Sequence, residues 1–339
     1  MSVNEDLMVM ASDRPLQSVV RDEHLLLSPP HPPKVPIKLA GERPELTVVH
    51  YPQEFQEEAY APPRGVYEND EVRVEWQKLD GRQPFYHRNC DVDEISYQIA
   101  GERTLMTELG SVEHNWPGEF SRIPQGVAHD NRSRAESHLL FYIPAPVTEL
   151  VPAHRESRAM FPPFPGWQPG EANEAVSWNL GAPGRDVVLF PVDEQQLLDH
   201  VHSDDRRIQV LRADPDRDTR ADPDRDTTWM YGTDRIRLGL ITTVPGGERR
   251  YRRTLDADEI QYQANGHRTL ITQHGIVDLE PGDFVRIPLG ISHADVTTEP
   301  GDYVSLLSRS ELPQVADTAR TADQYSPERL AALNVEVHA

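Results

Sequence analysis

The stretch Glu94-Ile-Ser-Tyr-Gln-Ile-Ala-Gly-Glu-Arg-Thr-Leu-Met-Thr-Glu-Leu-Gly110 decides the fold, because the chain contains it twice. The second copy is Glu259-Ile-Gln-Tyr-Gln-Ala-Asn-Gly-His-Arg-Thr-Leu-Ile-Thr-Gln-His-Gly275, and ten of the 17 positions are identical. A second matching pair follows: Pro117-Gly-Glu-Phe-Ser-Arg-Ile-Pro-Gln-Gly-Val-Ala-His129 and Pro281-Gly-Asp-Phe-Val-Arg-Ile-Pro-Leu-Gly-Ile-Ser-His293. Agreement this dense indicates an internal duplication, so we expect two domains of one design.

Each copy consists of short apolar or alternating runs, such as Val72–Trp76 and Ile236–Ile241, separated by Gly and Pro. Pro-Gly pairs at 117–118 and 281–282 are typical of tight turns. Many short strands joined by such turns predict an all-β fold of the sandwich or jelly-roll type.

Composition excludes several classes of protein. The 339 residues include 34 basic and 56 acidic side chains, a formal net charge of −22, which argues against a nucleic-acid partner. No apolar run approaches the roughly 20 residues that cross a bilayer, so we expect no membrane association. The acidic start of the chain is unlike a secretory signal, and the single cysteine, Cys90, excludes an internal disulfide. We therefore expect a cytoplasmic protein.

The duplication and the composition together predict five segments. They are an N-terminal arm (1–45), a first barrel (46–150), a linker (151–190), a second barrel (191–315) and a C-terminal tail with a helix (316–339). The helix is indicated by Ser326 before Pro327 and by the apolar spacing of Leu330 and Leu333. The tandem repeat within 212–227 lacks the ligands and Gly of a calcium loop, so we expect it to be a solvated loop.

Metal donors accompany the first copy. His87 and Asn89 lie two residues apart in a strand-like stretch, so their side chains share a face. Glu94 needs a bulge or turn between it and His87 to face the same way, and Asp93 is a competing ligand. The interval from Glu94 to Gly101 recurs in the second copy, which favours Glu94. With His129, the set of two His and one carboxylate suits non-haem Fe(II).

The second copy has lost part of this set. Arg252 and Thr254 stand at the positions of His87 and Asn89, whereas Glu259 and His293 are kept. An arginine retains its proton and cannot ligate a metal. We therefore expect the second barrel to be degenerate and metal-free.

The paired motifs resemble those of the cupins. The pattern Gly-x5-Pro-x-Gly-x2-His matches the second cupin motif and is met by Gly118, Pro124, Gly126 and His129. The places of the first cupin motif are occupied by His87, Asn89, Glu94 and Gly101. The chain is thus similar to bicupins over roughly residues 65–310. This resemblance implies two tandem double-stranded β-helix (jelly-roll) barrels, and a homo-oligomer by analogy.

A narrower resemblance rests on the string Tyr86-His-Arg-Asn-Cys90, which is similar to the iron-binding strand of homogentisate 1,2-dioxygenases. It implies that His87, Glu94 and His129 bind Fe(II); Asn89 is a further candidate that touches the metal, orients a water or bonds backbone. Here the interval from His87 to Glu94 is one residue longer than in that family, and the ligand-bearing copy comes first.

In length and in its His-x-Asn motif the chain also resembles the large subunit of two-component hydroquinone dioxygenases, which leaves a small partner subunit open. Together these resemblances imply that the protein opens a hydroxylated aromatic ring with O2. The substrate expected is a para-diol such as homogentisate, gentisate or hydroquinone.

His114, His138 and Asn131 are candidate catalytic residues. Either histidine can serve as an acid/base or substrate donor, although a surface or core position would explain it as well. Asn131 and Trp116 are singled out because the second copy lacks them. By contrast, residues that recur in both copies are expected to be structural: Arg122 with Arg286, Tyr97 with Tyr262 and Gln98 with Gln263.

Two other classes of function remain open at this stage. Cupin metal sites also act as Lewis acids in isomerases and decarboxylases, with Mn, Ni or Zn and without O2. Bicupins can also be storage or sugar-binding proteins that keep the motifs only for the fold. Turnover without oxygen would select the first class, and a purified protein that resists iron loading would select the second.

Overall fold

The structure is a computed structural model of the whole chain. It describes residues 2–27, 45–53, 60–82, 86–89, 91–107, 110–114, 116–127, 129–144, 146–157, 174–177, 188–190, 207–213, 225–246, 249–323 and 326–334. Cys90, the proline-rich stretch at 28–33 and most of the tandem repeat (214–224) lie outside the described residues.

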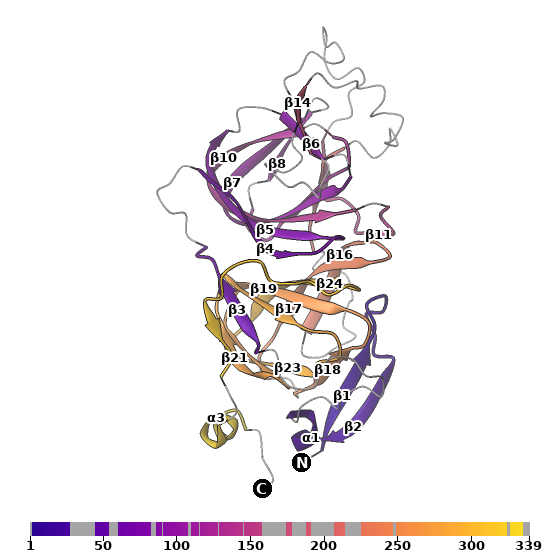
Figure 1. The fold of residues 1–339 in the computed structure, drawn as a ribbon, viewed down its shortest axis with the longest axis vertical. Helices are drawn as coiled ribbons and strands as arrows, with labels where there is room; N and C mark the ends of the chain where they lie inside the picture. The colour runs from indigo at the N-terminus through magenta and orange to yellow at the C-terminus, as the bar shows by residue number, and fades with distance from the viewer. Residues whose placement is uncertain are drawn as a thin grey trace.

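Strands are the main secondary structure of the described chain, which folds into two barrels, one above the other in Figure 1. The first barrel is one eleven-stranded sheet. Its strands are β4 (Tyr60–Glu68), β5 (Arg73–Arg82), β6 (Tyr86–Asn89), β7 (Asp93–Thr107), β8 (Gly110–His114), β9 (Phe120–Ile123), β10 (His129–Ile143), β12 (Arg155–Glu156), β13 (Glu174–Ser177), β14 (Val188–Phe190) and β15 (Gln209–Leu211).

The second barrel has two sheets. Its eight-stranded sheet holds β3 (Thr47–His50), β11 (Glu149–Leu150), β16 (Arg225–Gly232), β17 (Ile236–Thr243), β19 (Asp258–Asn265), β22 (Asp283–Ile287), β24 (Gly301–Ser308) and β25 (Arg320–Thr321). Its six-stranded sheet holds β1 (Ser2–Met8), β2 (Gln17–Asp22), β18 (Tyr251–Thr254), β20 (Arg268–Thr272), β21 (Gly275–Leu279) and β23 (His293–Thr297).

Short helices lie at both ends of the chain. The helix α1 (Glu23–Leu27) follows β2, and α3 (Pro327–Ala332) closes the C-terminal side. Ser326 caps α3 by accepting a hydrogen bond from the backbone N–H of Arg329, at 3.1 Å, and Leu330 is buried. The predicted bicupin fold with a short C-terminal helix is confirmed.

The two barrels exchange strands. Strand β3 pairs with β22 of the second barrel, with Val49 opposite Phe284. Strand β15 pairs with β9 of the first barrel, with Leu211 opposite Phe120. Each barrel therefore receives a strand from the segment that precedes the other barrel in sequence, and that strand lies inside the sheet, since β25 also pairs with β3 and β12 also pairs with β15.

One apolar core joins the two barrels. The equivalent residues Tyr97 and Tyr262 meet across the interface with ring centroids 6.4 Å apart. Each also packs on the phenylalanine of its own copy, Phe120 at 4.9 Å and Phe284 at 4.6 Å. All four are buried in a single cluster. The repeated tyrosines thus pack in the core, as their recurrence in both copies suggested.

Candidate metal centre

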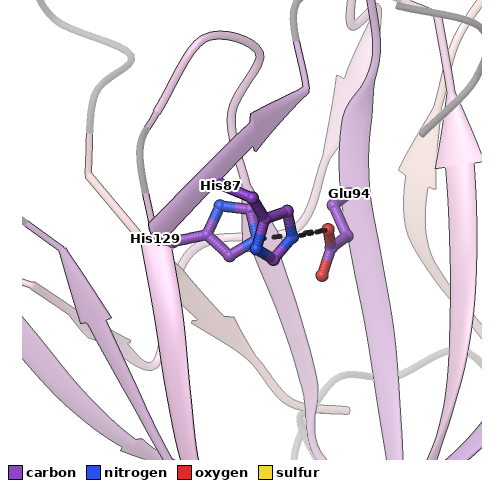
Figure 2. A group of neighbouring side chains, drawn as sticks. All are labelled: His87, Glu94 and His129. Atoms are coloured by element: carbon purple, nitrogen blue, oxygen red, sulfur yellow. Dashed lines mark hydrogen bonds and ion pairs between the residues drawn. The ribbon is translucent and has the colours of Figure 1, made fainter. Parts of the chain in front are cut away.

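Three side chains converge inside the first barrel, from three different strands (Figure 2). His87 comes from β6, Glu94 from β7 and His129 from β10, and their ligand atoms lie within 4.8 Å of one another. The Oε2 atom of Glu94 is 3.2 Å from Nε2 of His129 and 3.7 Å from Nε2 of His87. The group can therefore hold one metal ion with three protein donors.

The strand geometry explains the convergence. Strand β6 ends at Asn89 and β7 begins at Asp93, so the chain turns between His87 and Glu94 and brings both side chains to one face. In β10, His129 stands opposite His87. Nδ1 of His129 lies 2.9 Å from the carbonyl of Val127; with a proton on Nδ1, that contact directs Nε2 toward Glu94.

The charges of the three groups depend on each other. Burial alone would raise the pKa of Glu94, but the two imidazoles outweigh it and hold that pKa well below its usual range. Burial would likewise lower the pKa of His129, yet Glu94 raises it. Burial and the neighbouring His129 lower the pKa of His87. A metal cation would displace the proton of His129, because imidazole ligates only in its neutral form.

Asn89 and Asp93 have different surroundings. Nδ2 of Asn89 donates to Oε2 of Glu94 at 2.9 Å, so Asn89 holds the carboxylate in place. Asp93 instead accepts from Nε of Arg122 at 2.7 Å, from the backbone N–H of Gln125 at 2.8 Å and from the hydroxyl of Tyr231 at 3.1 Å. Its equivalent Asp258 bonds Arg286 and Leu289 in the same way. Asp93 therefore has a structural role shared by both barrels.

The second barrel keeps the geometry without the donor set. Arg252 stands opposite His293 just as His87 stands opposite His129. Nε2 of His293 is 3.6 Å from Oε2 of Glu259. The arginine takes the place of the first histidine, and an arginine side chain keeps its proton and does not ligate a metal.

The candidate catalytic residues fall in different places. His138 on β10 is buried, with Nδ1 2.9 Å from a carboxylate oxygen of Glu136; its Nε2 has no hydrogen-bond partner among the described residues. Asn131 is buried two residues beyond His129, on the same face of β10, and its Oδ1 also lacks a described partner. The backbone of His114 pairs with Arg103, and its side chain lies outside the described part. Trp116 is exposed at a surface turn.

The first barrel also contains buried charged groups that the motifs did not reveal. Glu75 is fully buried against Arg73, with Oε1 2.5 Å from Nε. Arg103 is buried and donates to the hydroxyls of Ser96 and Ser121 at 2.5 and 3.3 Å. The alternation of polar residues at 73, 75 and 77 in β5 is the signal that could have identified this polar interior.

A second cluster of possible donors belongs to the other barrel and consists of His50, exposed Glu280 and buried Asp283. Its central carboxylate, Asp283, is engaged by His50 at 2.9 Å and by the guanidinium of Arg320. A cation already neutralises this carboxylate, so we interpret the cluster as a salt-bridge network.

The fold and the site together define an all-β protein of two barrels with a candidate metal centre in the first. None of the helices in the described part of the chain is long and apolar enough to span a membrane. Neither the known family models nor the curated proteins include a match to this chain.

Several solved structures are similar to the chain. A cupin 2 conserved barrel domain protein from Leptotrichia buccalis is 9% identical over 80% of this chain and 92% of its own, with a TM-score of 0.43. A variant of Bacillus subtilis oxalate decarboxylase is 11% identical over 83% and 82%, with a TM-score of 0.46. Salicylate 1,2-dioxygenase from Pseudoaminobacter salicylatoxidans, in complex with gentisate, is 12% identical over 75% and 78%, with a TM-score of 0.44.

Proposed function

We propose that this protein is a non-haem Fe(II)-dependent dioxygenase that opens the ring of a para-diol, such as homogentisate, gentisate or hydroquinone. The observation that carries the proposal is the convergence of His87, Glu94 and His129 in one barrel, while Arg252 breaks the same set in the other. The similarity of the Tyr86–Cys90 string to homogentisate dioxygenases supports the choice of substrate.

The donor set fits iron(II). Two imidazoles and one carboxylate on one side of an ion leave other positions open, the arrangement typical of non-haem iron oxygenases. Asn89 fixes the carboxylate, and the carbonyl of Val127 fixes the ring of His129. Fe(II) bound there would supply open positions for a phenolate oxygen and for O2.

The surrounding residues prepare the barrel for this chemistry. His129 and Glu94 are buried, which excludes bulk water from the donor atoms. Burial lowers the pKa of His138 although Glu136 opposes the shift, so its imidazole is neutral near pH 7. When Nδ1 of His138 carries the proton and donates it in a hydrogen bond to Glu136, Nε2 is unprotonated. We assign to Nε2 the role of accepting the proton that a substrate hydroxyl releases. Asn131 is assigned the orientation of the substrate.

The decisive experiment combines metal analysis with oxygen uptake. Protein loaded anaerobically with Fe(II) is expected to bind one iron per chain and to consume O2 with at least one of the diols homogentisate, gentisate and hydroquinone. His87→Ala and His129→Ala should each abolish uptake, because a two-donor site holds iron weakly. The matched control is His267→Ala, which removes an exposed histidine that pairs with Glu299 on the surface of the second barrel.

Other results would contradict the proposal in distinguishable ways. Turnover of a substrate that continues without oxygen, with Mn, Ni or Zn in place of iron, would instead identify a Lewis-acid isomerase or decarboxylase. A folded protein that takes up no metal at this site would identify a binding or storage protein. A requirement for a small partner subunit would not contradict the proposal and would appear as uptake that is restored only by a cell extract.

A further inference from the structure

Tyr142, a residue that no motif includes, stands beside the metal donors in the first barrel. On one side this residue of β10 lies opposite Glu94 of β7. On the other side it lies opposite Arg73 of β5. Side chains at directly opposed positions of neighbouring strands have their Cβ atoms about 4.5–5.5 Å apart. The phenol of Tyr142 is therefore a neighbour of the carboxylate that would bind the metal.

The side chain of Tyr142 points into the first barrel. Its neighbours in sequence, Phe141 and Ile143, are buried in the apolar core that joins the two barrels. Because side chains alternate along a strand, Tyr142 faces the other way. It packs there with Val92 and Leu140 in a separate cluster. The tyrosine thus belongs to the interior that contains the candidate metal centre.

The hydroxyl of Tyr142 lies near the carboxylate of the site and is open to a ligand. Burial, followed by the charges of Glu94 and Glu75, raises the pKa of Tyr142, so the hydroxyl is close to both carboxylates. No hydrogen bond joins this hydroxyl to another described residue, although the side chain as a whole is buried. A phenol is protonated at neutral pH, so it can donate a hydrogen bond to an acceptor that enters the barrel.

The second barrel shows what this position borders. That barrel contains a cavity lined by the counterparts of the three metal donors, Arg252, Glu259 and His293. Leu307 stands opposite Glu259 and lines the same cavity. Tyr142 has the same relation to Glu94, so it borders the equivalent space in the first barrel. A leucine can only exclude water from such a space, whereas a phenol can also donate a hydrogen bond.

A second position of the lining has also become polar in the first barrel. Ile241 lines the cavity of the second barrel and stands opposite Tyr303. Its counterpart is Gln77, which stands opposite His138. Nε2 of Gln77 and Nε2 of His138 are buried and have no hydrogen-bond partner among the described residues. Buried polar groups usually have such partners, so these two point to a polar ligand in this barrel.

We propose that Tyr142 is a further catalytic residue of the proposed dioxygenase, because its hydroxyl donates a hydrogen bond to the substrate's phenolate oxygen beside Glu94. This inference rests on the proposed function and adds a contact to the substrate. Tyr142 keeps its own proton, so neither a proton nor an electron moves through it. A hydrogen bond to an ion is roughly twice as strong as one between neutral groups, so Tyr142 favours the ionised form of the substrate.

The test measures phenolate binding separately from turnover. Full-length protein is loaded with Zn(II), which does not react with O2, and is titrated with 4-nitrophenol, whose phenolate is yellow. Wild type should bind one phenolate per chain. Tyr142→Phe removes only the hydroxyl and should weaken phenolate binding about tenfold, with the metal content unchanged. The pH at which the bound ligand turns yellow should rise by about one unit, which is the same tenfold effect seen as ionisation.

The matched control is Tyr67→Phe. It removes the hydroxyl of another buried tyrosine, which lies in the core between the barrels and has no hydrogen-bond partner among the described residues. This change should leave phenolate binding as in wild type. Wild-type protein that binds no phenolate, or Tyr142→Phe that binds it at wild-type strength, would overturn the proposal. Loss of metal from Tyr142→Phe would overturn it too, because the hydroxyl would then support Glu94 instead of the substrate.

This inference and the proposed function fail in different ways. If iron-loaded wild type and Tyr142→Phe consume O2 equally well with the same diol, Tyr142 has no part in the reaction and the dioxygenase stands. If phenolate binding depends on Tyr142 but the iron-loaded protein consumes no O2, the contact to the ligand stands and the dioxygenase is rejected.

Discussion

The neighbouring carboxylates of Asp93 and Glu94 have different contacts. Glu94 faces two imidazoles in the barrel interior, whereas Asp93 accepts three hydrogen bonds, from Arg122, Gln125 and Tyr231. Tyr231 belongs to β16 of the other barrel, so Asp93 also connects the two halves of the molecule. At these two positions metal affinity and stability can be separated experimentally.

Glu94→Gln keeps the shape of the side chain and removes its charge. We expect the variant to stay folded and to lose at least about 100-fold in Fe(II) affinity, since even outer residues of metal sites contribute 10–100-fold. Asp93→Asn should keep one iron per chain but lose about 3–5 kcal/mol of stability, because it breaks a buried ion pair. Metal analysis and thermal unfolding measure the two effects, and an Asp93→Asn protein that lost iron while stable would contradict the assignment.

Glu75 makes the stability of the protein depend on pH. Burial, opposed only in part by Arg73, raises its pKa from 4.5 to about 7. The folded state therefore binds a proton that the unfolded state releases between these two values, so the contribution of Glu75 to stability falls as pH rises through that window.

Glu75→Gln should remove this dependence. Relative to wild type, the variant is expected to gain about 3 kcal/mol in unfolding free energy between pH 4 and pH 8. Urea unfolding at the two pH values measures the change, with Glu102→Gln, at an exposed position of the same barrel, as the control. An equal pH dependence in wild type and Glu75→Gln would show that the buried acid is not responsible.

The first-barrel donors could be predicted from the sequence because the cupin motifs specify spacing along two strands. The spacing of the motifs alone predicted that His87, Glu94 and His129 lie close together. Glu75 and Arg103 could not be predicted, since their burial depends on neighbours that are distant in sequence. Arg252, which stands at the position of His87 in the second barrel, was visible in the sequence, whereas the cavity that it lines required the folded chain.

At the scale of elements, the two copies differ in how their long strands bend. Strands β7 and β10 run 15 residues each, while their counterparts are divided into β19 with β20 and β24 with β23. Both copies change direction at a motif glycine, Gly101 or Gly266, with φ of +74° and +68°. Backbone atoms of a neighbouring segment lie directly against each glycine: those of β10 against Gly101, and those at the start of β24 against Gly266.

Gly101→Ala should therefore be far more damaging than Gly118→Ala. A Cβ at Gly101 would lie 2.3 Å from the carbonyl oxygen of Ala135, whereas the space around Gly118, also at positive φ, is open. We expect losses of about 3–5 kcal/mol at Gly101, from strain and overlap together, and about 1–2 kcal/mol at Gly118, from strain alone. Chemical denaturation compares them, and equal losses would refute the close approach.

The turns and the repeat of these elements could be predicted, but not their pairing. Strands β3 and β15 have only four and three residues, and nothing in so short a run indicates which barrel it joins. Their partners are selected by the side chains that they cover, Phe284 and Phe120. Such pairing is a tertiary property.

At the scale of the whole molecule, the exchanged strands and the shared core make the two barrels one unit. Tyr262 is buried, packs on Phe284 of its own barrel and faces Tyr97 of the other. A substitution of Tyr262 should therefore destabilise both barrels.

Tyr262→Ala should lower the melting temperature of the whole protein in a single calorimetric transition. Loss of a buried aromatic ring costs about 3–5 kcal/mol. Iron release should follow the same transition although the mutated residue lies in the barrel without the metal centre. Two separate transitions, with iron retained through the first, would show that the barrels unfold independently.

The strand exchange also governs the order in which a new chain can finish folding on the ribosome. The barrel with the candidate metal centre lacks its strand at 209–211 until that segment has been synthesised, although its three donors are complete by residue 129. Strand β1, at residues 2–8, can pair with β18 only after residues 251–254 have been synthesised, which is later still. A nascent protein thus exposes unpaired strand edges through much of its translation, and iron delivered early would meet a barrel that is not yet closed.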